Sequence, residues 1–206
     1  MSMELIANLA YLVAAVLFIF GLKMLGHPDT ARRGNFLSAL GMLIAVVAGL
    51  TVEGIVSFEY IIGGMLVGSI IGALAARLVA MTSMPERVAL FNGSGGSASL
   101  LVGWGTLYSG DISTFTAFTV VLAILIGGIT CTGSIIAYAK LSESLGPFPF
   151  PSAAKPFPGQ RIVNSILLIA MLASGIQFCM NPSVDSQWLY AVLGLALILG
   201  VMAVFP

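Results

Sequence analysis

The sequence predicts an all-α protein, a polytopic transmembrane bundle of about seven helices. Composition is the first reason, because 59% of the residues are hydrophobic and 8% are charged, whereas a soluble domain carries about 25% charged residues. The second reason is a series of uncharged runs near the roughly 20 residues that a helix needs to cross a hydrocarbon core about 30 Å thick. Eight basic and eight acidic residues leave no basic surface for nucleic acid, so the expected partner is the lipid bilayer.

The first three runs cover residues 5–25, 35–51 and 58–80. The first is not a signal peptide, because its positive charges at Lys23, Arg32 and Arg33 follow the apolar run and no small-residue cleavage site comes after it. The third carries Gly64, Gly68 and Gly72 at intervals of four residues. Small residues at this spacing lie on one helix face and predict a surface for packing against another helix.

The fourth and fifth runs cover residues 84–108 and 113–140. Ser83 followed by Glu86 is the pattern of a capping box, and Pro85 suits a first helical turn, so a helix is expected to begin at this point. The fifth run is uncharged up to Lys140.

The sixth and seventh runs cover residues 161–180 and 187–205. A polar connector, residues 141–161, precedes the sixth, and its five prolines forbid a continuous helix and favour an extended cytoplasmic strap. All seven runs together are expected to form a single transmembrane domain, residues 1–206.

The positive charges predict the orientation of the bundle. All eight Lys and Arg residues lie near the first, third and fifth connections, and the other three connections contain only acidic charges. Because loop Lys and Arg stay in the cytoplasm, the N-terminus is expected outside and the C-terminus in the cytoplasm. Aromatic residues typical of a membrane interface gather at the predicted outer ends: Tyr60, Trp104, Tyr108, Trp188 and Tyr190.

The segment "GSGGSA", from Gly93 to Ala98, matches the spacing of a dinucleotide-binding glycine loop. That loop requires a preceding strand and a helix that begins at the glycines. Here the predicted helix begins before Gly93, and no charge occurs from Val88 to Gly110. The structural context of a nucleotide loop is therefore absent, and no bound cofactor is expected.

Two stripes of polar and small residues are predicted instead. At 100° per residue, Asn92, Gly96, Ser99 and Gly103 share a narrow face of the fourth helix. Residues Gly127, Thr130, Cys131, Ser134 and Tyr138 do the same on the fifth. Counting from the inner ends at about 1.5 Å per residue places Asn92 and Ser134 at similar depth. Close helix packing, with Gly96 and Gly103 as contact points, is the simplest explanation; a hydrated interior is the other.

Neither Asn nor Ser titrates near neutral pH, and among the span interiors only Cys131 is ionisable. If protons cross at this level, a partner must contribute the titrating group. Cys131 and Cys179 differ by about 13 Å in expected depth, too far for a disulfide. The sequence contains no catalytic triad, phosphate loop or metal-ligand cluster.

Three segments carry a family resemblance: "AYLVAAVLFIFGL", "TSMPERVALFNGSGG" and "TCTGSIIAYAKLSE". They resemble the beta subunit of proton-translocating NAD(P) transhydrogenase, and the resemblance runs from the first span through the sixth. It implies the membrane domain of an enzyme complex that couples proton movement to hydride transfer between NAD(H) and NADP(H) in a bacterial inner membrane. It also implies that both nucleotides bind outside this chain, and that the complex is a dimer with alpha-type subunits, which supply membrane helices and an NAD-binding domain, and with an NADP-binding domain.

The resemblance gives Asn92 and Ser134 a role in the proton path. Many members carry a membrane histidine where this sequence has Asn92, and a functional serine at the position of Ser134. The departure at Asn92 implies that a partner alpha-type helix carries the protonatable histidine. Two other functions fit the composition: a small secondary transporter or channel subunit, in which the stripes line a solute path, and a membrane assembly scaffold.

Overall fold

The computed structural model describes residues 3–51, 58–78, 80–108, 112–142, 157–182 and 186–204. These residues form seven α-helices and one 3-10 turn: α1 (Met3–Leu25), α2 (Pro28–Leu50), α3 (Phe58–Leu78), η1 (Met81–Ser83), α4 (Met84–Thr106), α5 (Thr114–Leu141), α6 (Gln160–Met180) and α7 (Gln187–Val204). The predicted all-α fold class is confirmed. The helix α2 begins seven residues before the expected start at residue 35, because Pro28 and Asp29 suit a first turn. Most of the connector 141–161 lies outside the described residues.

Six of the seven described helices are long and apolar enough to span a membrane. The exception, α4, has the same 23-residue length as α1 and α2. It contains no window apolar enough for a span, because Asn92 and a run of Gly and Ser occupy its middle. One of the two helices that carry a predicted polar stripe is therefore also the one that is not apolar enough to face lipid on all sides.

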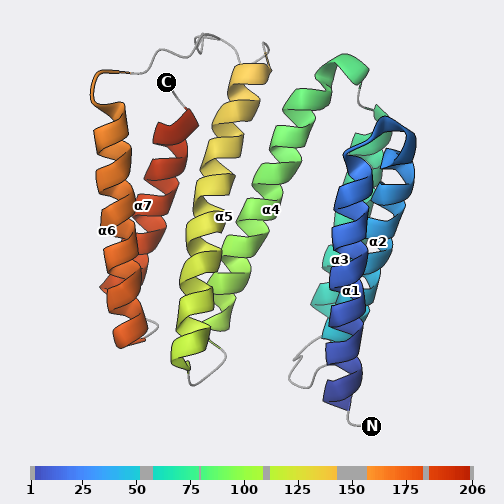
Figure 1. The fold of residues 1–206 in the computed structure, drawn as a ribbon, viewed down its shortest axis with the longest axis horizontal. Coiled ribbons are helices and arrows are strands. Elements are labelled where there is room, and N and C mark those ends of the chain that lie inside the picture. The colour runs from blue at the N-terminus through green and yellow to red at the C-terminus, as the bar shows by residue number, and fades with distance from the viewer. Residues whose placement is uncertain are drawn as a thin grey trace. The chain divides into compact units, whose positions relative to one another are not determined.

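The chain divides into two compact units, residues 1–74 and 75–206. In the first unit, α1 and α2 lie side by side (Figure 1). Glycines bring their backbones together: a Cβ at Gly34 would lie 2.7 Å from the Gly21 carbonyl oxygen, and one at Gly41 would lie 3.1 Å from the Ala14 carbonyl oxygen. The predicted single domain, residues 1–206, stays a prediction.

The helix α3 has no buried residue in the described part of the chain. A Cβ at Gly64, Gly68 or Gly72 would meet no atom within 4 Å. The packing surface predicted at these three glycines therefore has no occupant among the described residues, and its role stays a prediction.

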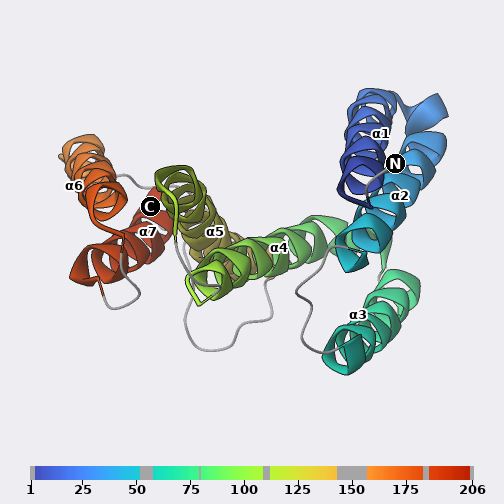
Figure 2. The ribbon, with the colours of Figure 1, turned by 90° about the horizontal axis from the view of Figure 1, so that it is seen from below.

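In the second unit, α5 is the central helix. It packs against α4, α6 and α7, and α6 also packs against α7 (Figures 1 and 2). The hydrophobic core between α5, α6 and α7 contains fully buried side chains, including those of Ala117, Ile124, Met171, Phe178, Leu189 and Val192. The unit thus has an apolar interior beside α7 and, as described below, a polar seam beside α4.

Two helix starts in this unit show different chemistry. Helix α4 begins at Met84, as predicted, but the capping-box prediction is wrong, because the Ser83 side chain makes no capping hydrogen bond. Ser83 belongs to the 3-10 turn η1, with φ −92° and ψ 6°, rather than to the extended backbone of an N-cap. At the start of α5, Ser113 does cap its helix, accepting a hydrogen bond from the Thr116 backbone N–H at 3.1 Å.

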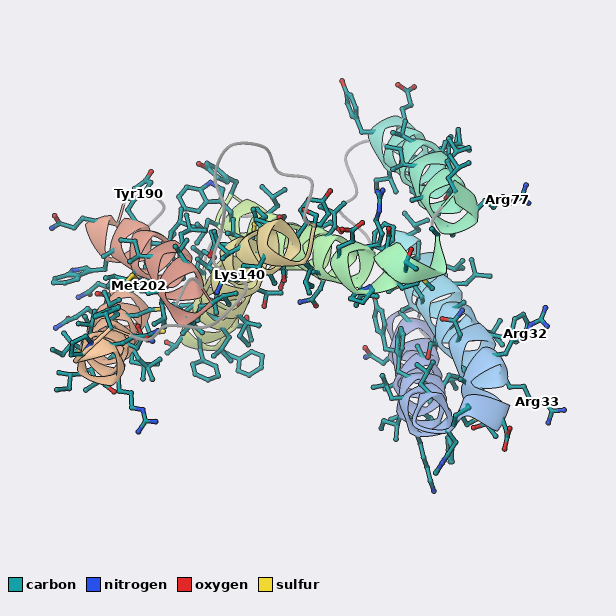
Figure 3. The ribbon with its side chains drawn as sticks, turned by 90° about the horizontal axis from the view of Figure 1, so that it is seen from above. Arg32, Arg33, Arg77, Lys140, Tyr190 and Met202 are labelled. Carbon is teal, nitrogen blue, oxygen red and sulfur yellow. The ribbon has the colours of Figure 1, made fainter. Side chains whose placement is uncertain are left out.

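The orientation follows from charge and stays a prediction. Figure 3 shows Arg32 and Arg33 projecting away from α2, where both are exposed. In a complete enzyme reconstituted with a single introduced cysteine, Arg33→Cys is expected to react with a membrane-impermeant maleimide from the cytoplasmic side. Tyr108→Cys, near the end of α4, is expected to react from the outside. The reverse pattern of labelling would contradict the assignment of the N-terminus to the outside.

Candidate functional site

Helices α4 and α5 cross at glycines, so that their backbones come into contact. A Cβ at Gly96 would lie 2.8 Å from the Cys131 backbone nitrogen and 2.9 Å from the Gly127 carbonyl oxygen. On the other side, a Cβ at Gly127 would lie 2.7 Å from the Gly96 carbonyl oxygen. Gly103 is also buried against α5, with its Cβ position 2.9 Å from the Ala123 Cβ. We call this contact, from Asn92 to Gly103 on α4 and from Val120 to Ser134 on α5, the α4–α5 seam.

Asn92 and Ser134 meet within the α4–α5 seam. The Asn92 Nδ2–H donates a hydrogen bond of 2.9 Å to the Ser134 Oγ. Gly93 makes this approach possible, because a Cβ there would lie 3.0 Å from the Ser134 Cβ. The two residues are 42 positions apart in sequence and come from antiparallel helices. The hydrogen bond can form only if both side chains lie at the same depth in the membrane.

The two partners of this bond differ in exposure. Ser134 is 7% exposed, whereas Asn92 is an exposed residue of α4. No described residue donates a hydrogen bond to the Asn92 Oδ1. The amide therefore uses its N–H group within the chain and presents its acceptor to whatever lies beside α4.

A second polar contact lies about one turn away, between Cys131, which belongs to the predicted stripe of the fifth helix, and Ser97, which does not belong to the predicted stripe of the fourth. The Ser97 Oγ is 3.0 Å from the Cys131 Sγ and also donates a hydrogen bond of 3.0 Å to the Gly93 carbonyl oxygen. Ser99, a member of the predicted stripe, makes no hydrogen bond through its side chain among the described residues. A helix that crosses another at an angle uses two adjacent columns of residues. The sequence does offer one indication of Ser97: it lies four residues after Gly93, and residues at this spacing share one face of a helix.

The chemistry of the seam is limited to hydrogen bonding. An amide, two hydroxyls and a thiol can orient water or a neighbouring polar group, and neither the amide nor the hydroxyls titrate near neutral pH. Within the described residues, no group of three or more His, Cys, Asp or Glu could hold a metal ion. The segment Gly93–Ala98 lies inside α4, with helix on both sides, so the prediction that a helix begins before Gly93 is confirmed.

The aromatic residues predicted at one membrane interface include a pair in contact. Trp104 of α4 and Tyr190 of α7 have ring centroids 5.4 Å apart at an interplanar angle of 62°. This edge-to-face geometry is the favoured one for aromatic pairs. It joins α4 to α7 at the end of the unit opposite to Met84.

The chain is similar to known proteins along almost its entire length. The family model described as NAD(P) transhydrogenase beta subunit matches residues 7–206. Two relatives, both named NAD(P) transhydrogenase subunit beta and both from Rhodospirillum rubrum, the second from a specified strain, are each 32% identical over 208 residues. The alignment covers 96% of this chain and 43% of the length of either relative. The chain thus spans less than half the length of the relatives that it matches.

Proposed function

Because the chain belongs to the family of NAD(P) transhydrogenase beta subunits, we propose that it forms part of a proton path through the membrane. In this proposal, proton movement past the α4–α5 seam is coupled to hydride transfer between NAD(H) and NADP(H). Both nucleotides bind in soluble domains outside this chain. The chain itself contributes no catalytic residue and holds no cofactor. Alpha-type subunits supply further membrane helices and the NAD-binding domain, and the complete complex is a dimer in a bacterial inner membrane.

The observation that carries the proposal is the hydrogen bond between Asn92 and Ser134. The two polar side chains are bonded to each other where small residues bring α4 and α5 together. This supports a polar environment at their depth in the membrane. Polar groups at such positions commonly line proton relays in pumps and transporters. The exposed Asn92 then faces a partner helix or water rather than lipid.

The geometry suggests how the two residues act. Since Asn92 donates to the Ser134 Oγ, the Ser134 hydroxyl proton is left to donate to a water molecule or to an imidazole nitrogen. The Asn92 Oδ1 accepts from a second water or from a protonated imidazole. The pair can therefore orient a group that carries protons, but neither Asn92 nor Ser134 can itself carry a proton near neutral pH. We propose that a histidine on an alpha-type helix beside α4 is that carrier, because histidine titrates near pH 6.5.

Ser134→Ala tests the proposal. The change removes the hydroxyl and leaves the Asn92 amide without its partner, so proton pumping by the complete enzyme in vesicles is expected to fall by about tenfold, the equivalent of one lost hydrogen bond. Hydride transfer measured with a protonophore present is expected to fall less. The matched control is Ser94→Ala on the exposed face of α4, where the hydroxyl donates a hydrogen bond to the Phe91 carbonyl of its own helix.

If Ser134→Ala pumps protons at the wild-type rate and assembles normally, the α4–α5 seam is a packing surface and the chain is a membrane scaffold. Saturable transport of a solute by this chain alone would instead favour a small transporter.

A further inference from the structure

Side chains from two neighbouring helices hold the second half of α7. The Thr132 Oγ1 donates a hydrogen bond of 2.9 Å to the Leu197 carbonyl. Nearer the end of the helix, the Gln160 Nε2 donates to the Met202 carbonyl at 3.0 Å, and the Lys140 Nζ donates to the Val204 carbonyl at 2.6 Å. Figure 3, which looks onto this end of the unit, labels Lys140 and Met202 on the adjacent helices α5 and α7. We call Lys140 and Gln160 the α7 clamp.

The α7 clamp has a clear physical cause. The last four carbonyls of an α-helix have no partner within the helix, and together they carry a partial negative charge. An ammonium group supplied from a neighbouring helix satisfies one carbonyl and also interacts favourably with the helix dipole. Lys140 is half-buried, so its aliphatic stem packs against protein while its charged end reaches the last described turn of α7.

Helix α5 connects this clamp to the α4–α5 seam, because it packs on two sides through adjacent residues. Gly133 faces α7, with its Cβ position 3.3 Å from the Gly200 carbonyl oxygen, while the next residue, Ser134, faces α4. Gly128 and Gly127 show the same division, toward Ala196 and toward Gly96 respectively. Because α4 is also joined to α7, through Trp104 and Tyr190, the position of α5 along α7 contributes to the height of Ser134 relative to Asn92.

The bond between Asn92 and Ser134 is sensitive to that height. A slip of one residue along a helix is about 1.5 Å, roughly half the 2.9 Å length of the bond. In the half of the contact between α5 and α7 that lies nearest Ser134, the close approaches are at Gly128, Gly133 and Gly200, whereas the large buried side chains, such as Ile124 and Leu189, lie in the other half. The directional hydrogen bonds at Thr132, Gln160 and Lys140 add to the resistance that the apolar core provides.

We infer that Lys140 is a positioning residue of the proton path: its bond to the Val204 carbonyl sets the axial register of α5 against α7, and with it the contact between Ser134 and Asn92. Lys140 is six residues beyond Ser134, about 9 Å along the same helix, so it does not touch the proton carrier itself. The inference rests on the proposed function, and it names a residue outside the α4–α5 seam through which the path is controlled.

The test compares Lys140→Met with Lys140→Arg in the complete enzyme in vesicles. Methionine keeps an unbranched apolar stem but loses the donor and the charge, whereas arginine keeps both. Lys140→Met is expected to lower the number of protons moved per hydride transferred by about tenfold, the equivalent of one lost charged hydrogen bond. Lys140→Arg is expected to restore most of this ratio. Hydride transfer with a protonophore present is expected to change little in either variant.

Lys23→Met is the matched control. It makes the same change at the end of another helix, α1, where the lysine forms no hydrogen bond with α7 in the described part of the chain. If Lys140→Met does not assemble, Lys140→Gln replaces it, and a reduced ratio of protons to hydride is required of that variant. A normal ratio in Lys140→Met or Lys140→Gln, or a ratio that arginine does not restore, overturns the inference. Such a result leaves the proposed function standing as long as Ser134→Ala pumps poorly, so the two failures are distinguishable.

Discussion

Gly96→Leu is expected to separate α4 from α5 and to prevent the second unit from folding. The three atoms nearest to a Cβ at this position lie within 2.9 Å, and two of them, the Cys131 nitrogen and the Gly127 oxygen, belong to the backbone of α5. Backbone atoms cannot rotate away as a flexible side chain can. The expected cost is therefore at least about 3 kcal/mol, the upper end for overpacked interiors. Gly127→Leu is expected to have the same effect from the opposite side of the crossing.

The control for this prediction is the neighbouring glycine of the same helix. A Cβ at Gly95 would meet no atom within 4 Å, so Gly95→Leu is expected to leave the isolated chain as stable in detergent as the wild type. The measurement is the thermal unfolding of the purified chain, followed by its helical circular dichroism, together with the amount recovered from membranes. Equal stability of Gly95→Leu and Gly96→Leu would contradict the described crossing of α4 and α5.

Asn92→Leu is expected to have the largest effect on activity. It removes the donor to Ser134 and the acceptor that faces outward from α4, and it places an apolar group at the polar level of the membrane. Proton-coupled turnover of the complete enzyme is expected to fall by about 100-fold, as when a positioned relay group is lost. Assembly is expected to survive, because Asn92 is exposed and Gly93 and Gly96 form the close contact with α5.

Asn92→His provides the complementary measurement. In an enzyme from which the partner histidine has been removed, this change returns a group that titrates near pH 6.5 to the same level of the membrane. Proton pumping is expected to recover, with a pH dependence centred near that value. Failure of Asn92→His to restore pumping, combined with wild-type pumping by Asn92→Leu, would place the proton path away from the α4–α5 seam.

The helices of this chain could be predicted from its sequence because the physical requirement is simple. A span needs about 20 apolar residues, and the runs end where Pro, Gly and charged residues cluster. For this reason α6, expected from residue 161, begins at Gln160, and α7, expected from residue 187, begins at Gln187. The depth argument likewise brought Asn92 and Ser134 to one level, where the structure joins them by a hydrogen bond.

The details that could not be predicted depend on three-dimensional packing. A single angular stripe cannot represent two crossing helices, so it included Ser99 and missed the contact between Ser97 and Cys131. The sequence shows Lys140 only as a charge at the end of a span, because its partner is a backbone carbonyl 64 residues away. Backbone carbonyls carry no sequence signal. The same limit applies to Ser83, where the residue type suits a capping box but the backbone conformation does not.

The contacts of α5 also determine the order in which this part of the chain can fold. The bond between Asn92 and Ser134 joins two consecutive helices and closes a loop of 42 residues, so it can form as soon as α5 has entered the membrane. The bond between Lys140 and Val204 spans 64 residues and must wait until α6 and α7 have been synthesised. Until then, the face of α5 that contains Gly128 and Gly133 is exposed to lipid or to other membrane proteins. Late insertion of α7 is thus the step at which the second unit closes and at which a nascent chain is most open to wrong helix pairing.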